Sequence, residues 1–297
     1  MAQVEVVKDS EQELSSWHCQ QLESGGILLF PEMDLGLSEE DRRFLLGQRQ
    51  SAAPYHKNIA YRPSQDTLTG VARGSDREQL RRILRSYSQQ AANVLARLFP
   101  RYARGCQMDF TSFRPFEEQG RDLSLPSRND LLHVDAFPTR PTNGDRILRF
   151  FTNLNPRQPR VWITAEPFEA LATAFAREAG LAELARRSAS TVHRALARLG
   201  RFAGVSSLGR SPYDAVMHRF HNFLKESRHF QETCRKERVE FPPGSSWLVF
   251  TDMVSHAVLG GQFALEQTFI VSREAMLRPE RAPINVLERI TAVRLSW

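Results

Sequence analysis

Three residues in this sequence have the types and spacing of metal ligands. His133 and Asp135 stand two positions apart in the segment LLHVDAF, so their side chains would share one face of an extended strand. His256 follows much later, in a second apolar segment. Two imidazoles and one carboxylate on one face of an octahedral ion leave three positions open, as in non-haem iron(II) oxygenases. A hydrogen-bonded pair without metal is the alternative for His133 and Asp135.

Arginines interrupt the apolar segment that follows the first two candidate ligands. In residues 146–155, RILRFFTNLN, strand periodicity places Arg149 and Asn153 on one face, and phenylalanines fall on both faces. A guanidinium on a covered strand needs an anion, which can be a protein carboxylate or a bound dicarboxylate such as 2-oxoglutarate. Both alternatives stay open on spacing alone. The same reasoning applies to three further residues of nearby strands: Arg114, Arg160 and Trp162.

The composition is that of a soluble globular protein with a basic surplus. The 297 residues include 41% hydrophobic and 25% charged residues, and 40 Lys and Arg exceed 34 Asp and Glu. This balance favours acidic partners, such as nucleic acid, phosphorylated lipid or sugar acids, without choosing among them.

Several classes of protein are disfavoured by what the sequence lacks. The first twenty residues have neither the basic head nor the apolar segment of a secretory signal, and no apolar run approaches membrane-spanning length. The three cysteines show no CxxC spacing, which suits a reducing compartment. No phosphate-binding glycine motif, nucleophile motif or nucleic-acid recognition motif is present. We therefore expect a cytoplasmic protein that does not bind nucleic acid.

The elements that must position the candidate ligands follow from apolar periodicity. One helix is expected over 75–99, capped by Ser75 with Glu78 three residues on. A helical block is expected near 167–231, and strands are expected on both sides of it. The expected strands are 25–31, 106–116, 131–135, 146–155, 160–168 and a group within 245–271. A sheet resumed after a helical insertion predicts a single α+β domain, residues 1–297, with one closed or double-layered β core.

A pair of histidines and an arginine-rich stretch lie outside the candidate metal site. His218 and His221 are three residues apart on a predicted helix, and without a third ligand they indicate a packed helix face, with His221 able to line the mouth of a pocket. The stretch 177–210 carries seven arginines against two glutamates. Such a run is either a solvated face or a surface that rests on an anionic membrane.

Three long segments of the sequence resemble the bacterial Kdo hydroxylases. These segments are HVDAFPTRPTNGDRILRFFTNLNP, RVWITAEPFE and WLVFTDMVSHAVLGGQFALEQTFIV, and the similarity extends over roughly residues 25–291. Members of this family are Fe(II)- and 2-oxoglutarate-dependent dioxygenases that hydroxylate carbon 3 of 3-deoxy-D-manno-oct-2-ulosonic acid (Kdo) in the lipopolysaccharide inner core. The resemblance implies the same activity on Kdo-bearing lipid A, with O2 as co-substrate, and a possible site of action on the cytoplasmic face of the inner membrane.

The resemblance also implies a fold and a set of site residues. The fold would be a double-stranded β-helix, or jelly roll, with flanking helices and a helical insertion between the two halves of the metal site. Iron would be held by His133, Asp135 and His256, and 2-oxoglutarate by Arg149 first, with Arg114, Arg160, Trp162 and Asn153 nearby. Many 2-oxoglutarate enzymes carry an arginine about ten residues after the distal histidine, where this sequence has Glu266. The arginine that binds the distal carboxylate of 2-oxoglutarate must therefore come from another strand.

Two rival functions remain at this stage. The first keeps the iron chemistry but acts on a protein side chain or on another acidic sugar. The second is a cupin-like binding module that holds a metal or a sugar without turnover. The sequence leaves the oligomeric state open.

Overall fold

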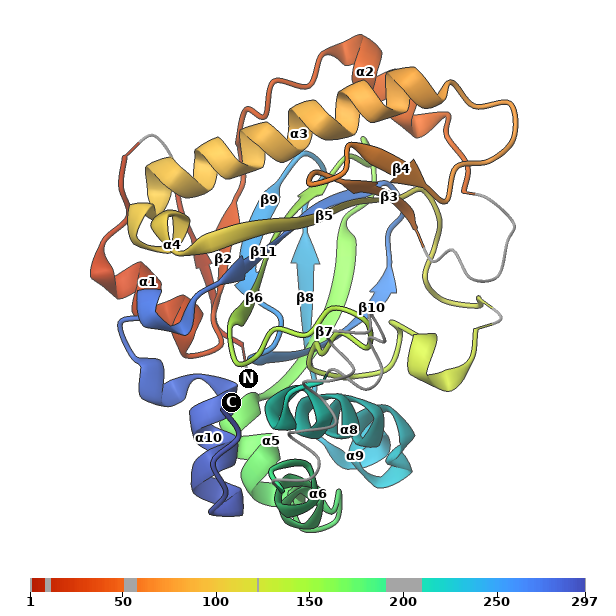
Figure 1. Cartoon of the computed structure of the whole chain (residues 1–297). Helices are drawn as coiled ribbons and strands as arrows, with labels where there is room; N and C mark the ends of the chain where they lie inside the picture. Colours follow the sequence, from red (N-terminus) through yellow and green to blue (C-terminus); the bar gives the residue numbers. More distant parts are fainter. Residues whose placement is uncertain (1, 9–11, 51–57, 122, 191–209, 297) are drawn as a thin grey trace.

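A computed structural model describes residues 2–8, 12–50, 58–121, 123–190 and 210–296 (Figure 1). Two β-sheets form its centre, and helices cover them on the outside. This arrangement confirms the expected α+β class.

The larger sheet has eight strands in the order β1-β2-β9-β6-β11-β5-β3-β4. All neighbours pair antiparallel except β1 and β2, which run parallel. The strands are β1 (Val4–Val6), β2 (Ile27–Phe30), β3 (Ile59–Arg62), β4 (Thr67–Thr69), β5 (Cys106–Arg114), β6 (Arg146–Asn153), β9 (Ser246–Phe250) and β11 (Ala264–Val271).

The smaller sheet has three antiparallel strands in the order β10-β7-β8. They are β7 (Arg160–Pro167), β8 (Glu237–Phe241) and β10 (Val254–Gly260). Side chains from both sheets line one cavity of about 670 Å³, so the sheets enclose it between them. Two facing sheets with a cavity between them are the architecture of a jelly roll, as expected.

Strand periodicity decides which side chains face the cavity. Arg149 and Phe151 of β6 line it, as do Glu266 and Thr268 of the neighbouring β11. Alternate residues of β5, β7 and β10 do the same: Ser112 and Arg114, Arg160 and Trp162, and His256 and Val258. The inner faces of these five strands are therefore polar and aromatic, while an apolar core lies behind them.

Most of the helices lie in two groups, and α1 lies beside β2 and β9 of the large sheet (Figure 1). The long helix α3 crosses the outside of the large sheet, with α2 beside it, and the second group lies at the opposite end of the molecule. The helices are α1 (Ser16–Glu23), α2 (Glu39–Leu46), α3 (Arg77–Leu98), α4 (Pro100–Arg104), α5 (Phe168–Phe175), α6 (Leu181–Ser188), α8 (Pro212–Glu226), α9 (Arg228–Thr233) and α10 (Pro283–Thr291). Four of them, α5, α6, α8 and α9, fall within the expected helical block. Residues 191–209, which hold much of the basic stretch 177–210, lie outside the described residues.

Two local expectations were wrong. Residues 131–135 form no strand, because only His133 pairs with the β10 backbone, through a single isolated bridge to His256. The cap of α3 is Asp76 rather than Ser75: the Asp76 carboxylate accepts a hydrogen bond from the backbone N–H of Gln79 at 2.9 Å. An aspartate at the cap adds a negative charge at the positive end of the helix dipole.

The cap assignment predicts a difference between two adjacent substitutions. Asp76→Ala should lower the free energy of unfolding by about 1 kcal/mol, because an orphan N–H of the first helical turn loses its acceptor. Ser75→Ala should change it by less than about 0.5 kcal/mol, as for an ordinary surface position. Urea denaturation followed by circular dichroism measures both, and a larger loss for Ser75→Ala would contradict the assignment.

Candidate metal centre

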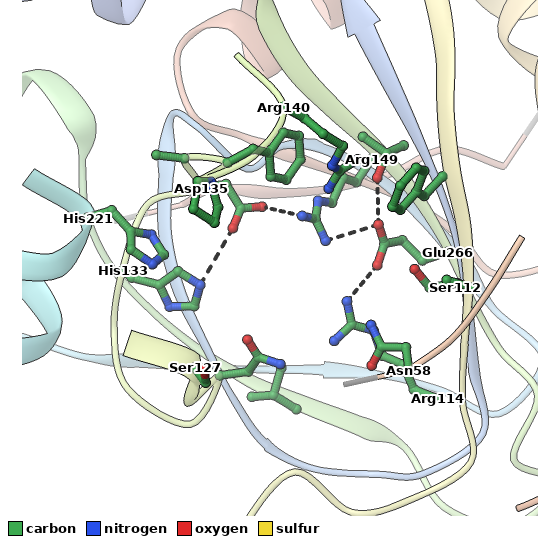
Figure 2. A pocket seen from close by; sticks show the side chains of 18 of the residues that line it. Asn58, Ser112, Arg114, Ser127, His133, Asp135, Arg140, Arg149, His221 and Glu266 are labelled. Atoms are coloured by element: carbon green, nitrogen blue, oxygen red, sulfur yellow. Dashed lines mark hydrogen bonds and ion pairs between the residues drawn. The ribbon is translucent and has the colours of Figure 1, made fainter. Parts of the chain in front are cut away.

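The three predicted ligands lie together on one wall of the cavity. Ligand atoms of His133, Asp135 and His256 all lie within 4.8 Å of one another, although the helical block separates the first two from the third in sequence. The backbones of the two histidines bind each other, with His256 N–H donating to the His133 carbonyl at 2.9 Å and the reverse bond at 3.1 Å. Figure 2 shows His133 and Asp135 pointing into the same space. The structure thus brings together all three residues.

The hydrogen bonds of both imidazoles prepare them to bind a metal. His133 Nδ1 lies 2.7 Å from the carbonyl oxygen of Leu131, and His256 Nδ1 lies 2.8 Å from that of Val254. A carbonyl only accepts, so each Nδ1 carries the proton and each Nε2 has a free lone pair. Burial lowers the pKa of both histidines, which keeps them neutral at ordinary pH.

The carboxylate of the group is ionised in spite of its burial. Burial would raise the pKa of Asp135, but the charge of Arg149 at 3.0 Å holds it well below its usual range. Two neutral imidazoles and one anionic oxygen form a donor set suited to a divalent transition metal. The residues present therefore fit an iron(II) ion.

Aromatic rings pack against the two histidines. Trp162 stacks on His256 with ring centroids 5.0 Å apart, and His221 meets His133 edge to face at 5.0 Å. His221 lines the cavity and its Nδ1 lies 2.7 Å from the Val134 carbonyl. Among the described residues, no group with the geometry of a metal site includes His218 or His221, and both of these histidines line the cavity.

A line of alternating charges begins at the metal ligand. Arg149 binds Asp135 with one nitrogen and Glu266 with the other, both at 3.0 Å. The second oxygen of Glu266 lies 2.6 Å from Arg114 (Figure 2). Burial would raise the pKa of Glu266, but these two arginines lower it below its ordinary value. Glu266 is therefore the shared anion of two guanidinium groups in the wall, those of the buried Arg114 and the largely buried Arg149.

The same line continues to the small sheet. Arg114 also binds Glu118 at 3.0 Å, and Glu118 lies 3.8 Å from Arg160 of β7. Arg160 donates a further hydrogen bond to the carbonyl of Gly261. Burial lowers the pKa of Arg160 to about 10, and Glu118 opposes that effect. Three strands of the large sheet and one of the small sheet are thus joined by charges inside the barrel.

The predicted co-substrate residues divide into two groups. Arg149, Arg114, Arg160 and Trp162 all line the cavity with the metal ligands. Asn153 does not: its amide donates to the carbonyls of Gln158, Phe241 and Pro242, and its side-chain oxygen accepts from Asn155 N–H. These bonds fix the turn after β6, so the expectation that Asn153 binds the cofactor was wrong. The last residue of a strand turns with the following loop and leaves the face set by periodicity.

Several cavity residues were missed by reasoning from the sequence. Arg62, Arg140 and Lys225 line the cavity beside the predicted arginines, and they raise its basic residues to six against two carboxylates. Arg140 follows the HVDAFP segment closely, which was a usable signal. Arg62 and Lys225 come from β3 and α8, and no motif in the sequence connects them with the metal ligands.

Metal binding should depend on the three ligands and on no exposed histidine. We expect one cobalt(II) ion per chain by calorimetry. His133→Ala and His256→Ala should each weaken binding by more than the roughly 10- to 100-fold that loss of an outer-sphere partner causes. His229→Ala, which changes an exposed histidine, is the matched control and should bind as the native chain does. Equal affinities for all four proteins would refute the site.

The charge line predicts a large effect for its central carboxylate. Glu266→Ala should lower the free energy of unfolding by about 3–5 kcal/mol, because it leaves the buried Arg114 and the largely buried Arg149 without their shared anion. Glu240→Ala removes the exposed partner of Arg238 and should change stability by less than about 1 kcal/mol. Urea denaturation compares the two, and similar small losses would show that the line does not stabilise the fold.

Comparison with known proteins identifies the family. The family model for 3-deoxy-D-manno-oct-2-ulosonic acid (Kdo) hydroxylase matches residues 5–294. No curated protein matches the sequence. An apo structure of the Kdo hydroxylase KdoO, described as a non-heme Fe(II) alpha-ketoglutarate-dependent dioxygenase, has a TM-score of 0.83 and 35% identity, covering 99% of this chain and 97% of that chain. The KdoO complex with alpha-ketoglutarate and Fe(III) has a TM-score of 0.82 and 34% identity, with the same coverage. The chain therefore belongs to the Kdo hydroxylase family.

Proposed function

We propose that this chain is an Fe(II)- and 2-oxoglutarate-dependent dioxygenase that hydroxylates Kdo. The observation that carries the proposal is the convergence of His133, Asp135 and His256 at the wall of a basic cavity. Relatives support it, because KdoO has been crystallised with alpha-ketoglutarate and Fe(III) and with succinate and Fe(III). Succinate is the product expected of 2-oxoglutarate in such a reaction.

The protein and the metal have separate tasks in this reaction. Iron bound by the three ligands supplies the oxidising chemistry, with 2-oxoglutarate and O2 as co-substrates. His133, Asp135 and His256 would hold the ion, and Arg149 fixes the orientation of the Asp135 carboxylate. The surrounding wall binds the acids and keeps bulk water away from the reacting atoms.

We assign 2-oxoglutarate to the arginines and the tryptophan of the wall. The Nε–H groups of Arg149, Arg114 and Arg160 and the indole N–H of Trp162 are buried and have no hydrogen-bond partner among the described residues. A buried donor without an acceptor is unfavourable, so an incoming dicarboxylate would satisfy groups that the protein leaves unpaired. Arg149 remains our first choice because it also contacts the ligand Asp135.

The cavity size supports a sugar headgroup as the acceptor. A volume of about 670 Å³ lies within the range of roughly 300–1,000 Å³ that small-molecule sites occupy, and it is too small for a whole glycolipid. We propose Kdo on lipid A as the acceptor and carbon 3 as the position of hydroxylation. The lipid portion would then stay outside the cavity.

The location of the reaction remains a proposal. No helix within the described ranges is long and apolar enough to cross a bilayer. We propose a cytoplasmic enzyme of one domain, whose basic stretch 177–210 can rest on the inner membrane, although much of that stretch lies outside the described residues.

Turnover with defined acceptors tests the proposed function. The purified chain with Fe(II), 2-oxoglutarate, O2 and Kdo-bearing lipid A should release succinate and add one oxygen to Kdo, as seen by mass spectrometry. His133→Ala should abolish both products. Oxygen added instead to another sugar acid or to a peptide would show that Kdo is not the substrate. Binding of Kdo-bearing lipid A without release of succinate would indicate a binding module.

Two tryptophans offer a matched test of the co-substrate pocket. Trp162→Phe keeps a ring against His256 but removes the N–H, and it should raise the KM for 2-oxoglutarate about three- to tenfold, as expected for one lost hydrogen bond. Trp247→Phe removes an equally buried N–H that also has no acceptor within the described ranges and lies on a residue outside the cavity lining, and its KM should stay unchanged. Equal behaviour of the two variants would contradict the assignment.

A further inference from the structure

Two arginines of the cavity wall make no ion pair with the buried charge line. Arg62, the last residue of β3, lies with its guanidinium carbon 4.8 Å from the ring centre of Phe110. Arg140 lies against two rings, 4.1 Å from Phe110 and 3.9 Å from Phe137. All four residues line the same cavity as the metal ligands. We call these four residues the arginine–phenylalanine cluster.

An irregularity in β5 shapes this cluster. The pairing of β5 with β11 shifts register between Gln267 and Phe269, so Asp109 and Phe110 stand together opposite Thr268 alone. Two residues against one is a β-bulge, a device that redirects side chains and that occurs often beside active sites. In a regular strand these neighbours would face opposite sides of the sheet. Here the Arg140 guanidinium pairs with the Asp109 carboxylate and also packs on the Phe110 ring.

The cluster has more positive than negative charge. In the described part of the chain, Asp109 is the one carboxylate that forms an ion pair with the cluster, through Arg140. Within the same residues Arg62 forms no ion pair, and its Nε–H has no hydrogen-bond acceptor. Burial lowers the pKa of Arg140 to about 9, and repulsion from Arg149 and Arg62 contributes. Figure 2 shows Arg140 on the same side of the cavity as Arg149 and Asp135. An anion placed between these cations would relieve that repulsion.

We propose that Arg62 and Arg140 bind an oxyanion of the acceptor substrate, separately from the arginines that bind 2-oxoglutarate. The oxyanion is either the carboxylate of the sugar acid or a phosphate on the glycolipid that carries it. This proposal rests on the proposed function, because it assigns one part of the cavity to that acceptor. It adds two residues that determine which acceptor the enzyme accepts.

The geometry suits a planar or tetrahedral oxyanion. Phenyl rings lie against both guanidinium groups, and the N–H donors project from the edge of a guanidinium plane, where carboxylate and phosphate oxygens bind. Contact with the rings also restricts the arginines before binding, so less conformational entropy is lost when the anion arrives. The co-substrate has its own donors on Arg149, Arg114 and Arg160, which belong to the charge line. Arg62 and Arg140 are the remaining arginines among the lining residues, and they are available for the acceptor anion.

Equilibrium binding tests the proposal without depending on turnover. The cobalt(II)-loaded chain is titrated by calorimetry with the methyl glycoside of Kdo, with Kdo-bearing lipid A and with 2-oxoglutarate. Arg62→Gln and Arg140→Gln should each weaken acceptor binding about tenfold or more, the loss expected for a charge-assisted hydrogen bond. Binding of 2-oxoglutarate should stay within about twofold of the native value. Arg228→Gln, at an exposed position on α9, is the matched control.

Two further acceptors separate the sources of the anion. If the carboxylate is bound, the native chain should prefer the glycoside acid over its methyl ester, and Arg140→Gln should erase that preference. If a phosphate is bound, the native chain should prefer the phosphorylated glycolipid over its dephosphorylated form, and the same variant should erase that preference instead. Either result supports the cluster as an oxyanion site.

Three results would overturn the proposal. The first is acceptor binding that neither arginine variant changes, and the second is a native chain that binds neither the glycoside nor the glycolipid. The third is a loss of 2-oxoglutarate affinity that equals the loss of acceptor affinity, which would assign the cluster to the co-substrate. A native chain that binds the acceptor through these arginines but releases no succinate would refute the proposed function and leave the oxyanion site standing.

Discussion

Buried charge is the constraint on which this structure depends. Burying a guanidinium group without an anion is costly, and here carboxylates alternate with arginines from Asp135 through Arg149, Glu266, Arg114 and Glu118 to Arg160. The line starts at a metal ligand, crosses β6, β11 and β5, and ends on β7 of the facing sheet. It fixes the shape of the wall and the orientation of the ligand carboxylate together. Removing one carboxylate would disturb both the fold and the site.

The metal centre adds a second connection between distant parts of the chain. His133 and His256 exchange backbone hydrogen bonds, so the loop that carries two ligands is held directly against the strand that carries the third. The helices inserted between them pack outside the barrel, although α8 contributes His221 and Lys225 to the cavity. The insertion therefore contributes to the cavity wall, and the arrangement of the three metal ligands comes from the sheets and from the backbone bridge between His133 and His256.

The sequence predicted the features that depend on local pattern. Apolar periodicity located β6, β7 and α3 to within a few residues. The family resemblance, rather than strand alternation, put Arg149 and Trp162 in one pocket, and both line the cavity. Local pattern failed where long-range contacts decide the outcome. The segment 131–135 lacks strand pairing except at one bridge, Asn153 turns into loop contacts, and the short β3, which supplies Arg62, has no distinctive pattern. The β5 bulge depends on its register against β11, which no local pattern reveals.

The position of the bound metal tests the account most directly. An anomalous difference map from a crystal of the chain grown with cobalt(II) should show one strong peak within about 2 Å of His133 Nε2, His256 Nε2 and an Asp135 carboxylate oxygen. That result would place the ion at the start of the charge line and at the wall of the basic cavity. A peak bound by His221 or His218 instead, or no peak beside Asp135, would contradict the account.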